Sequence, residues 1–193
     1  YTVKVFENVS GTSYAQAVSQ TIQVNIASDT TPFLYPNQFC NFNADSNVVT
    51  VSDTITSGMT DPLKKVEAIY NYAVDNITYD NQKAATVQSG YLPNVDATLA
   101  QKKGICFDYA AVMTSMLRAQ GIPTKLVIGY AGNVYHAWVS VYIQGQGWVD
   151  NIIYFDGTDW KLMDPTFVSS GKKSAEVLNY VSNPANYRQK FCY

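Results

Sequence analysis

Few side chains in this chain can serve as a nucleophile or a proton carrier. It has one histidine, His136, and three cysteines, Cys40, Cys106 and Cys192, among 193 residues. Cys106 stands at the front of a stretch that reads as a helix, where unpaired backbone N–H groups and the helix dipole favour a thiolate and can bind an oxyanion. A thiolate that attacks an amide needs a proton donor for the departing amine, and His136 is the only imidazole available. These residues indicate thiol-dependent acyl transfer.

Such chemistry also needs a group that holds the imidazole in its useful tautomer. An aspartate at the end of a neighbouring antiparallel strand is suited to this, and Asp164 ends the stretch "WKLMDPTF". Each residue also has a structural explanation: Cys106 as a small buried side chain, His136 as a core imidazole, and Asp164 as the first residue of a turn. Taken one at a time, these structural explanations are favoured.

Two helices are predicted from apolar periodicity and end signals. "TDPLKKVEAIYNYAVDNI", from Thr60, offers a cap, a proline in the first turn and an apolar face. The second helix runs from about Cys106 to Gln120, has an apolar interior and stops at Gly121, with Pro123 beyond it. The polar connection between the two helices is expected to hold one short helix.

Strands are predicted on either side of these helices. The first sixty residues alternate with period two, including Ile22, Val24 and Ile26 and later "NVVTVSDTI". After the second helix, "KLVIGY", "YHAWVSVYI", "WVDNIIYF" and "WKLM" are separated by turns. The order predicts an α+β fold in which the Cys106 helix packs on an antiparallel sheet.

Composition narrows the classes of partner and the setting. The net charge is −2 and there is no run of Lys or Arg, which argues against nucleic acid. No apolar run approaches the roughly 18 residues of a membrane span. The chain starts without Met or a leader, and its low charge favours an extracellular or cell-surface location. In such a setting Cys40 and Cys192 can form a disulfide, although two buried thiols explain them equally well.

Taken together, four blocks in order resemble the transglutaminase-like superfamily: "KKGICFDYAAVMTSMLRAQGIPTKLVIGY", "VYHAWVSVYI", "GWVD" and "MDPTF". The resemblance covers about residues 76–167 and is far more specific than any single motif. It implies a papain-like cysteine fold and a catalytic triad. By the matching positions, Cys106 is the nucleophile, His136 the base and Asp164 the orienting acid.

This sequence departs from the family pattern at two places. A segment intervenes between "GWV" and "DPTF", so Asp150 competes for the acid role; we favour Asp164 because it alone has the Pro-Thr context. Animal transglutaminases use a Trp upstream of the nucleophile at the oxyanion, and "YLPNVDATL" offers Tyr91 there. A Tyr hydroxyl can donate to an oxyanion, but a loop aromatic packed on the surface explains Tyr91 equally well.

The expected organisation is a single domain over 1–193, with a strand-rich extension (1–60), a catalytic core (61–168) and a tail (169–193). The expected function is acyl transfer on amide bonds of proteins or peptides through a thioester, with hydrolysis, including that of cell-wall peptides, favoured over cross-linking. The alternatives are a protein-glutamine cross-linker and a non-catalytic binding module of a surface protein. No cofactor is implied, and the scattered Cys and His residues do not suggest zinc.

Overall fold

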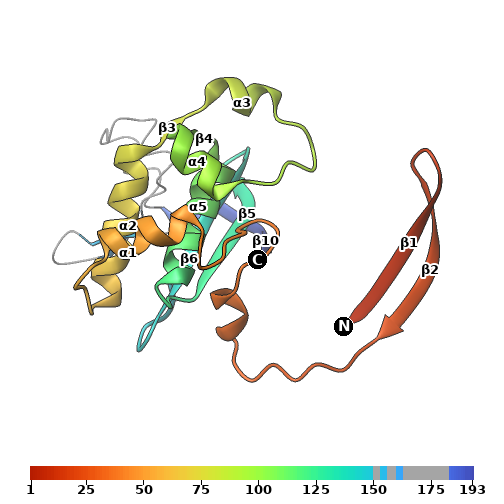
Figure 1. The fold of residues 1–193 in the computed structure, drawn as a ribbon, viewed down its shortest axis with the longest axis horizontal. Coiled ribbons are helices and arrows are strands. Elements are labelled where there is room, and N and C mark those ends of the chain that lie inside the picture. Colours follow the sequence, from red (N-terminus) through yellow and green to blue (C-terminus); the bar gives the residue numbers. More distant parts are fainter. Residues whose placement is uncertain (150–152, 156–159, 163–182) are drawn as a thin grey trace.

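The computed structural model describes residues 1–149, 153–155, 160–162 and 183–193. A hairpin of β1 (Thr2–Ser10) and β2 (Ser13–Thr21) stands apart from a body of helices and sheet (Figure 1). Every residue of both strands is exposed. Strands were expected in the first sixty residues, and β1 and β2 are such strands, but Ile22, Val24 and Ile26 form an extended connection after them and not a strand.

The sheet of the body has four strands in the order β10-β5-β6-β7, all antiparallel. They are β5 (Thr124–Ala131), β6 (Val134–Ile143), β7 (Gly147–Val149) and β10 (Tyr187–Cys192). A separate pair is formed by β8 (Ile153–Phe155) and β9 (Trp160–Leu162). The register places Gly129 opposite His136. The predicted antiparallel sheet is thus confirmed.

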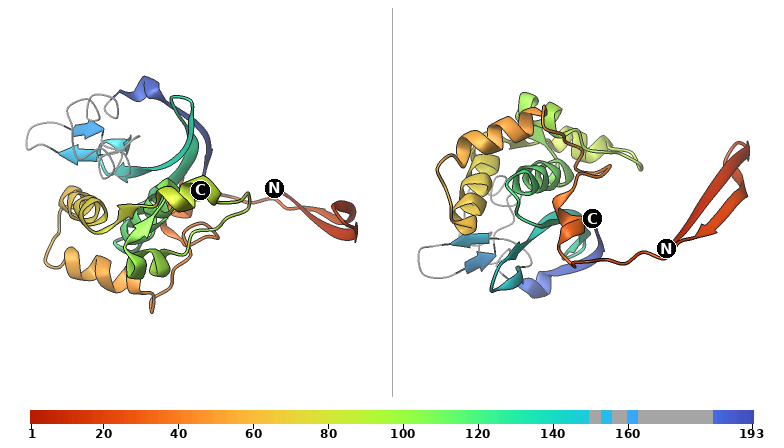
Figure 2. Two further views of the ribbon diagram at one scale, coloured as in Figure 1. Left: turned by 90° about the horizontal axis from the view of Figure 1, so that it is seen from above. Right: turned by 60° about the horizontal axis from the view of Figure 1, so that its bottom comes forward.

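Helix α5 (Cys106–Ala119) lies at the centre of the body, between the sheet and the other helices (Figure 2). All of its residues from Asp108 to Arg118 are buried. A helix that is apolar around most of its circumference must be covered on several sides, and here β5 and β6 cover one side while α1, α2 and α4 cover the other. The prediction that the Cys106 helix packs on the sheet is confirmed.

Helix α2 (Pro62–Asn76) begins as the sequence predicts. The Asp61 carboxylate accepts from the Leu63 N–H at 2.9 Å, and Pro62 occupies the first turn. The face that packs into the core carries Val66, Ile69, Tyr70, Ala73 and Val74.

The strand expected at "NVVTVSDTI" is wrong, because these residues form helix α1 (Asn47–Ile55). Val48 and Ser52, four residues apart, are buried, and the Ser52 hydroxyl donates to the Met116 carbonyl of α5 at 3.0 Å. The Asp96 carboxylate accepts from the N–H groups of Asn47 and Val48 at 3.1 and 2.8 Å. Packing on α5 and this cap therefore outweigh the strand propensity of the valines.

The connection from α2 to α5 holds two short helices where one was expected, α3 (Asn81–Thr86) and α4 (Val95–Gln101). A short parallel pair, β3 (Thr78–Tyr79) with β4 (Lys103–Gly104), closes the connection. Single 3-10 turns, η1 and η2, lie at Thr31–Leu34 and Pro184–Asn186. The boundaries at 60 and 169 stay predictions. Helix α1 precedes the first boundary and β10 follows the second, and both pack in the body.

Candidate active site

Cys106 is the first residue of α5, as the sequence predicts, and its side chain is partly exposed. The N–H groups of the first turn of a helix have no partner within the helix. One of the groups that precede this turn, the Ile105 N–H, is bound by the Asp108 carboxylate at 2.8 Å. A thiol therefore sits at a helix end that attracts negative charge.

The path of the chain gives an expectation of where His136 lies relative to Cys106. Helix α5, of 14 residues, is about 20 Å long. From its far end β5 runs back, and the stretch from Thr124 to Gly129, which faces His136, covers about 17 Å. Because α5 packs against both β5 and β6, we expect the start of β6 on the side of the sheet where α5 begins.

His136 is 5% exposed and stacks on Trp138, with ring centroids 6.3 Å apart. Side chains alternate along a strand, so His136 and Trp138 share one face of β6, while Ala137 and Val139 point into the core with α5. The imidazole is therefore not beneath the helix. To contact the Cys106 thiol, the imidazole must reach past the first turn of α5.

Both candidate acids, Asp164 and Asp150, lie outside the described residues. The choice between them accordingly stays a prediction. In the described part of the chain, no three His, Cys, Asp or Glu side chains gather as a metal site.

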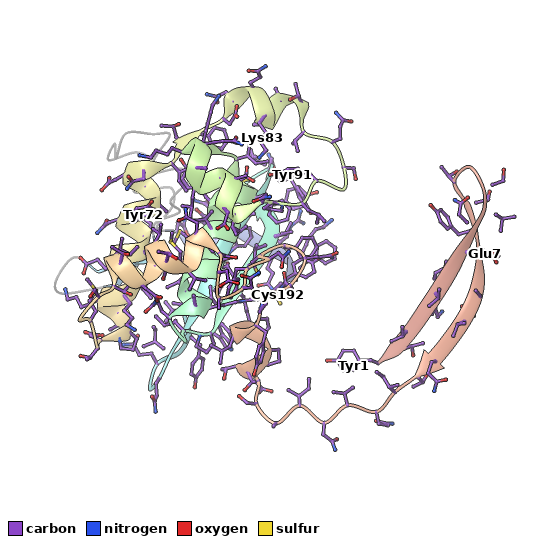
Figure 3. The ribbon with its side chains drawn as sticks, viewed as in Figure 1. Tyr1, Glu7, Tyr72, Lys83, Tyr91 and Cys192 are labelled. Atoms are coloured by element: carbon purple, nitrogen blue, oxygen red, sulfur yellow. The ribbon has the colours of Figure 1, made fainter. Side chains whose placement is uncertain are left out.

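A partly buried polar cluster adjoins Cys106: Lys83, Tyr91 and Asp108. The Asp108 side chain is 0% exposed and accepts from the Lys83 ammonium at 2.7 Å and from the Tyr91 hydroxyl. The ammonium also donates to the Tyr91 hydroxyl oxygen at 2.6 Å. Figure 3 shows Lys83 and Tyr91, which come from α3 and from the loop that follows it.

Electrostatics within the cluster favour the ion pair. Burial lowers the pKa of Lys83, but the hydrogen bonds to Asp108 and Tyr91 outweigh it and leave the pKa above its ordinary value. Burial and the hydrogen bond to Asp108 raise the pKa of Tyr91. The cluster therefore holds a charged lysine beside a neutral phenol.

The cluster bears on the role expected for Tyr91. Its hydroxyl hydrogen is donated to Asp108, and its ring meets Phe107, the neighbour of Cys106, edge to face at 6.3 Å. The oxyanion role of Tyr91 stays a prediction, and it would require the hydroxyl to leave Asp108. Asp108 itself was missed, although its place at the third position of a predicted helix is where a carboxylate closes a capping box.

Cys40 and Cys192 are free thiols in this structure, so the expected bridge is not formed here. Cys40 is buried, where its thiol contacts the side chains of Asn37 at 3.3 Å and Arg118 at 3.2 Å. Burial raises the pKa of Cys40. The residues next to the two cysteines, Phe39 and Tyr193, pack with ring centroids 4.3 Å apart. The two segments are therefore neighbours, and the bridge stays a prediction.

Comparison with known proteins gives a family and a fold. The model of the transglutaminase-like superfamily matches residues 49–151, just over half of the chain. An uncharacterized protein of Bacillus subtilis, YebA, is 29% identical over 66% of this chain, which spans 19% of YebA. The crystal structure of a candidate cysteine protease from Cytophaga hutchinsonii is 20% identical in sequence and superposes with a TM-score of 0.58. The match covers 88% of this chain and 48% of the Cytophaga protein. The chain thus spans half or less of the length of these relatives.

Proposed function

This chain belongs to the transglutaminase-like superfamily, and from that premise we propose that it is a thiol-dependent enzyme that acts on amide bonds of proteins or peptides. The superfamily is one of thiol-dependent enzymes. The observation that supports the proposal is the position of Cys106 on the first turn of α5, the helix that packs on the strand β6, of which His136 is the third residue. The proposal pairs this helix-end thiol with the only imidazole of the chain.

In the proposed reaction the Cys106 thiolate attacks the amide carbonyl carbon, and N–H groups at the start of α5 stabilise the oxyanion. The carbon–nitrogen bond breaks as His136 gives its proton to the departing amine, which leaves a thioester. An acceptor then loses a proton to His136, attacks the thioester and restores the thiol. Asp164 is proposed to orient the imidazole.

The acceptor decides which enzyme this is. With water the enzyme is a peptidase or amidase, and with a lysine amine it is a cross-linker. We favour hydrolysis, with proteins or peptides, including cell-wall peptides, as substrates. The proposed location is extracellular or at the cell surface, which the low charge of the chain supports. No helix among the described residues is long and apolar enough to cross a membrane.

The test compares variants in one assay that follows both peptide cleavage and incorporation of a labelled amine. Cys106→Ala and His136→Ala should each lower turnover at least a thousandfold, because each removes a reacting group. Asp164→Asn should lower it far more than Asp150→Asn. Cys192→Ser is the matched cysteine control and should keep wild-type turnover.

The outcomes of this assay distinguish a thiol-dependent hydrolase, a cross-linker and a non-catalytic binding module. Turnover by Cys106→Ala equal to that of the wild type would exclude the thiol mechanism. Amine incorporation in preference to cleavage would make the protein a cross-linker. An absence of both activities, with a Cys106 that reacts with iodoacetamide at the same rate in wild type and His136→Ala, would leave the non-catalytic binding module.

A further inference from the structure

A chain of aromatic side chains, most of them partly buried, leads away from Cys106. Phe107, the next residue, lies 5.8 Å from Phe39 between ring centroids, and Phe39 lies 4.3 Å from Tyr193. Tyr130 and Tyr135 follow, 5.5 Å apart. Tyr193 also stacks on Phe191 of β10, with ring centroids 6.4 Å apart, and Phe191 pairs with Ile128, two residues before Tyr130 on β5. We call these rings, with Tyr91 at the other side of Phe107, the aromatic band: Phe39, Tyr91, Phe107, Tyr130, Tyr135 and Tyr193.

The band lies on the helix side of the sheet. Along β5, Leu126 and Ile128 point into the core with α5, and Tyr130 is the next residue of the same face. Tyr135 is its partner across β6. Since β5 runs back toward the start of α5, the two tyrosines lie at the nucleophile end of the layer. There Tyr135 is 56% exposed, although it is an aromatic side chain surrounded by others.

Two cations lie at the end of the band farthest along this path from Cys106. The Arg188 guanidinium and the Lys190 ammonium lie 4.9 and 5.4 Å from the ring centre of Tyr130. Both belong to β10, where Arg188 pairs with Tyr130 across the sheet. Both are exposed, and neither forms an ion pair with an acidic side chain in the part of the chain that the structure describes. Their charge is therefore available to a ligand.

We propose that the aromatic band, with Arg188 and Lys190, is the substrate-binding surface of this protein and that it takes an extended polypeptide with a carboxylate side chain to one side of the reacting amide. The inference rests on the proposed function, because it assumes that the amide is delivered to Cys106. Aromatic rings supply rigid apolar area for a peptide at low entropic cost. Two cations over one of these rings select a carboxylate, which Arg binds in a bidentate manner.

The test measures binding and not turnover, on the full chain carrying Cys106→Ala. Fluorescence anisotropy compares the binding of two labelled peptides that share an apolar sequence containing Gln. The peptides differ at one position beside this sequence, which is Glu in one peptide and Gln in the other. The Glu peptide should bind at least fivefold more tightly, and the difference should shrink between 50 and 500 mM salt because an exposed charge pair is screened. Arg188→Gln with Lys190→Gln should remove the difference.

Matched controls keep the result specific. Lys4→Gln with Lys64→Gln removes two exposed cations elsewhere and should leave the preference unchanged. Tyr135→Ala should weaken both peptides by a similar factor, because it removes aromatic surface and no charge. Circular dichroism of each variant excludes unfolding as the cause.

Equal binding of the two peptides before any change to Arg188 and Lys190 would overturn the inference. Tighter binding of an acidic glycan than of the Glu peptide would overturn the assignment to a polypeptide. Since the Cys106→Ala protein does no chemistry, a preserved preference together with an inactive wild type would contradict the proposed function alone and uphold the binding surface.

Discussion

The two ends of helix α5 are each held by one buried charge of the helix itself, but the partners differ in kind. At the start, Asp108 binds the side chains of Lys83 and Tyr91. At the end, the Arg118 guanidinium donates to main-chain carbonyls: to Thr124 from two nitrogens, at 2.9 and 2.7 Å, to Tyr193 at 2.7 Å, and to Tyr35. Both charges have the sign that the helix dipole favours at their end.

The two sets of partners fix the helix in the fold in different ways. Arg118 joins three chain segments that are far apart in sequence, and 4% of the residue is exposed. It has no carboxylate partner among the described residues, and burial lowers its pKa. The side chain of Lys83, by contrast, is 29% exposed. The end away from Cys106 is therefore fixed through the backbone, while the Cys106 end is fixed through side chains of α3 and of the loop that follows it.

The largest effect is expected when the hydrogen bonds from Arg118 to the main-chain carbonyls are removed. Arg118→Met should lower the free energy of unfolding by about 4 kcal/mol, because several buried carbonyls lose their donors at once. Urea denaturation followed by tryptophan fluorescence measures it. Lys64→Met, which breaks an exposed pair with Glu67, is the control and should cost less than about 0.5 kcal/mol. A loss below about 1 kcal/mol for Arg118→Met would show that water replaces the guanidinium.

The ion pair at the other end should give a smaller effect. Asp108→Asn should cost about 2 kcal/mol, because Lys83 loses its carboxylate but can turn toward solvent. Urea denaturation of Asp108→Asn, Lys83→Met and the double variant completes a double-mutant cycle. We expect the double variant to be more stable than the sum of the single losses predicts. Strict additivity would mean that the two side chains do not stabilise each other.

The least effect on stability is expected at Tyr91. Tyr91→Phe removes one hydroxyl and should cost about 1 kcal/mol, with kcat on a peptide amide changed less than about threefold if the hydroxyl serves Asp108. A loss of kcat of about a hundredfold, with KM unchanged, would instead assign the hydroxyl to the oxyanion. Leu92→Ala, an exposed neighbour in the same loop, is the control for loop disturbance.

Local patterns were sufficient for the elements that combine a clear period with end signals. Helix α2 follows from Asp61, Pro62 and one apolar face, and α5 follows from its apolar run and from Gly121, which adopts a positive φ of 73° just after the helix. The pairing of β5 and β6 follows from the short turn between two alternating strands. In each case the signal lies within a few residues of the element.

The misplaced elements depend on partners that are distant in sequence. Residues 47–55 read as a strand because valines and threonines alternate, yet Ser52 and Val48 face α5 as a helix. Strand β10 lies in the segment expected as a tail and was not predicted, because its partner β5 is more than fifty residues away. Lys83 is ordinary in sequence and becomes notable only beside Asp108.

By itself the sequence determined the family, the α+β class and the position of Cys106 at the start of a helix, because these depend on motif order and on local periodicity. Which charges hold the two ends of that helix, and which aromatic rings lie beside its first turn, follows only from the folded arrangement. The physical reason is that a buried ion pair, a guanidinium on three carbonyls or an aromatic surface is assembled from segments whose separation in sequence carries no record of their proximity.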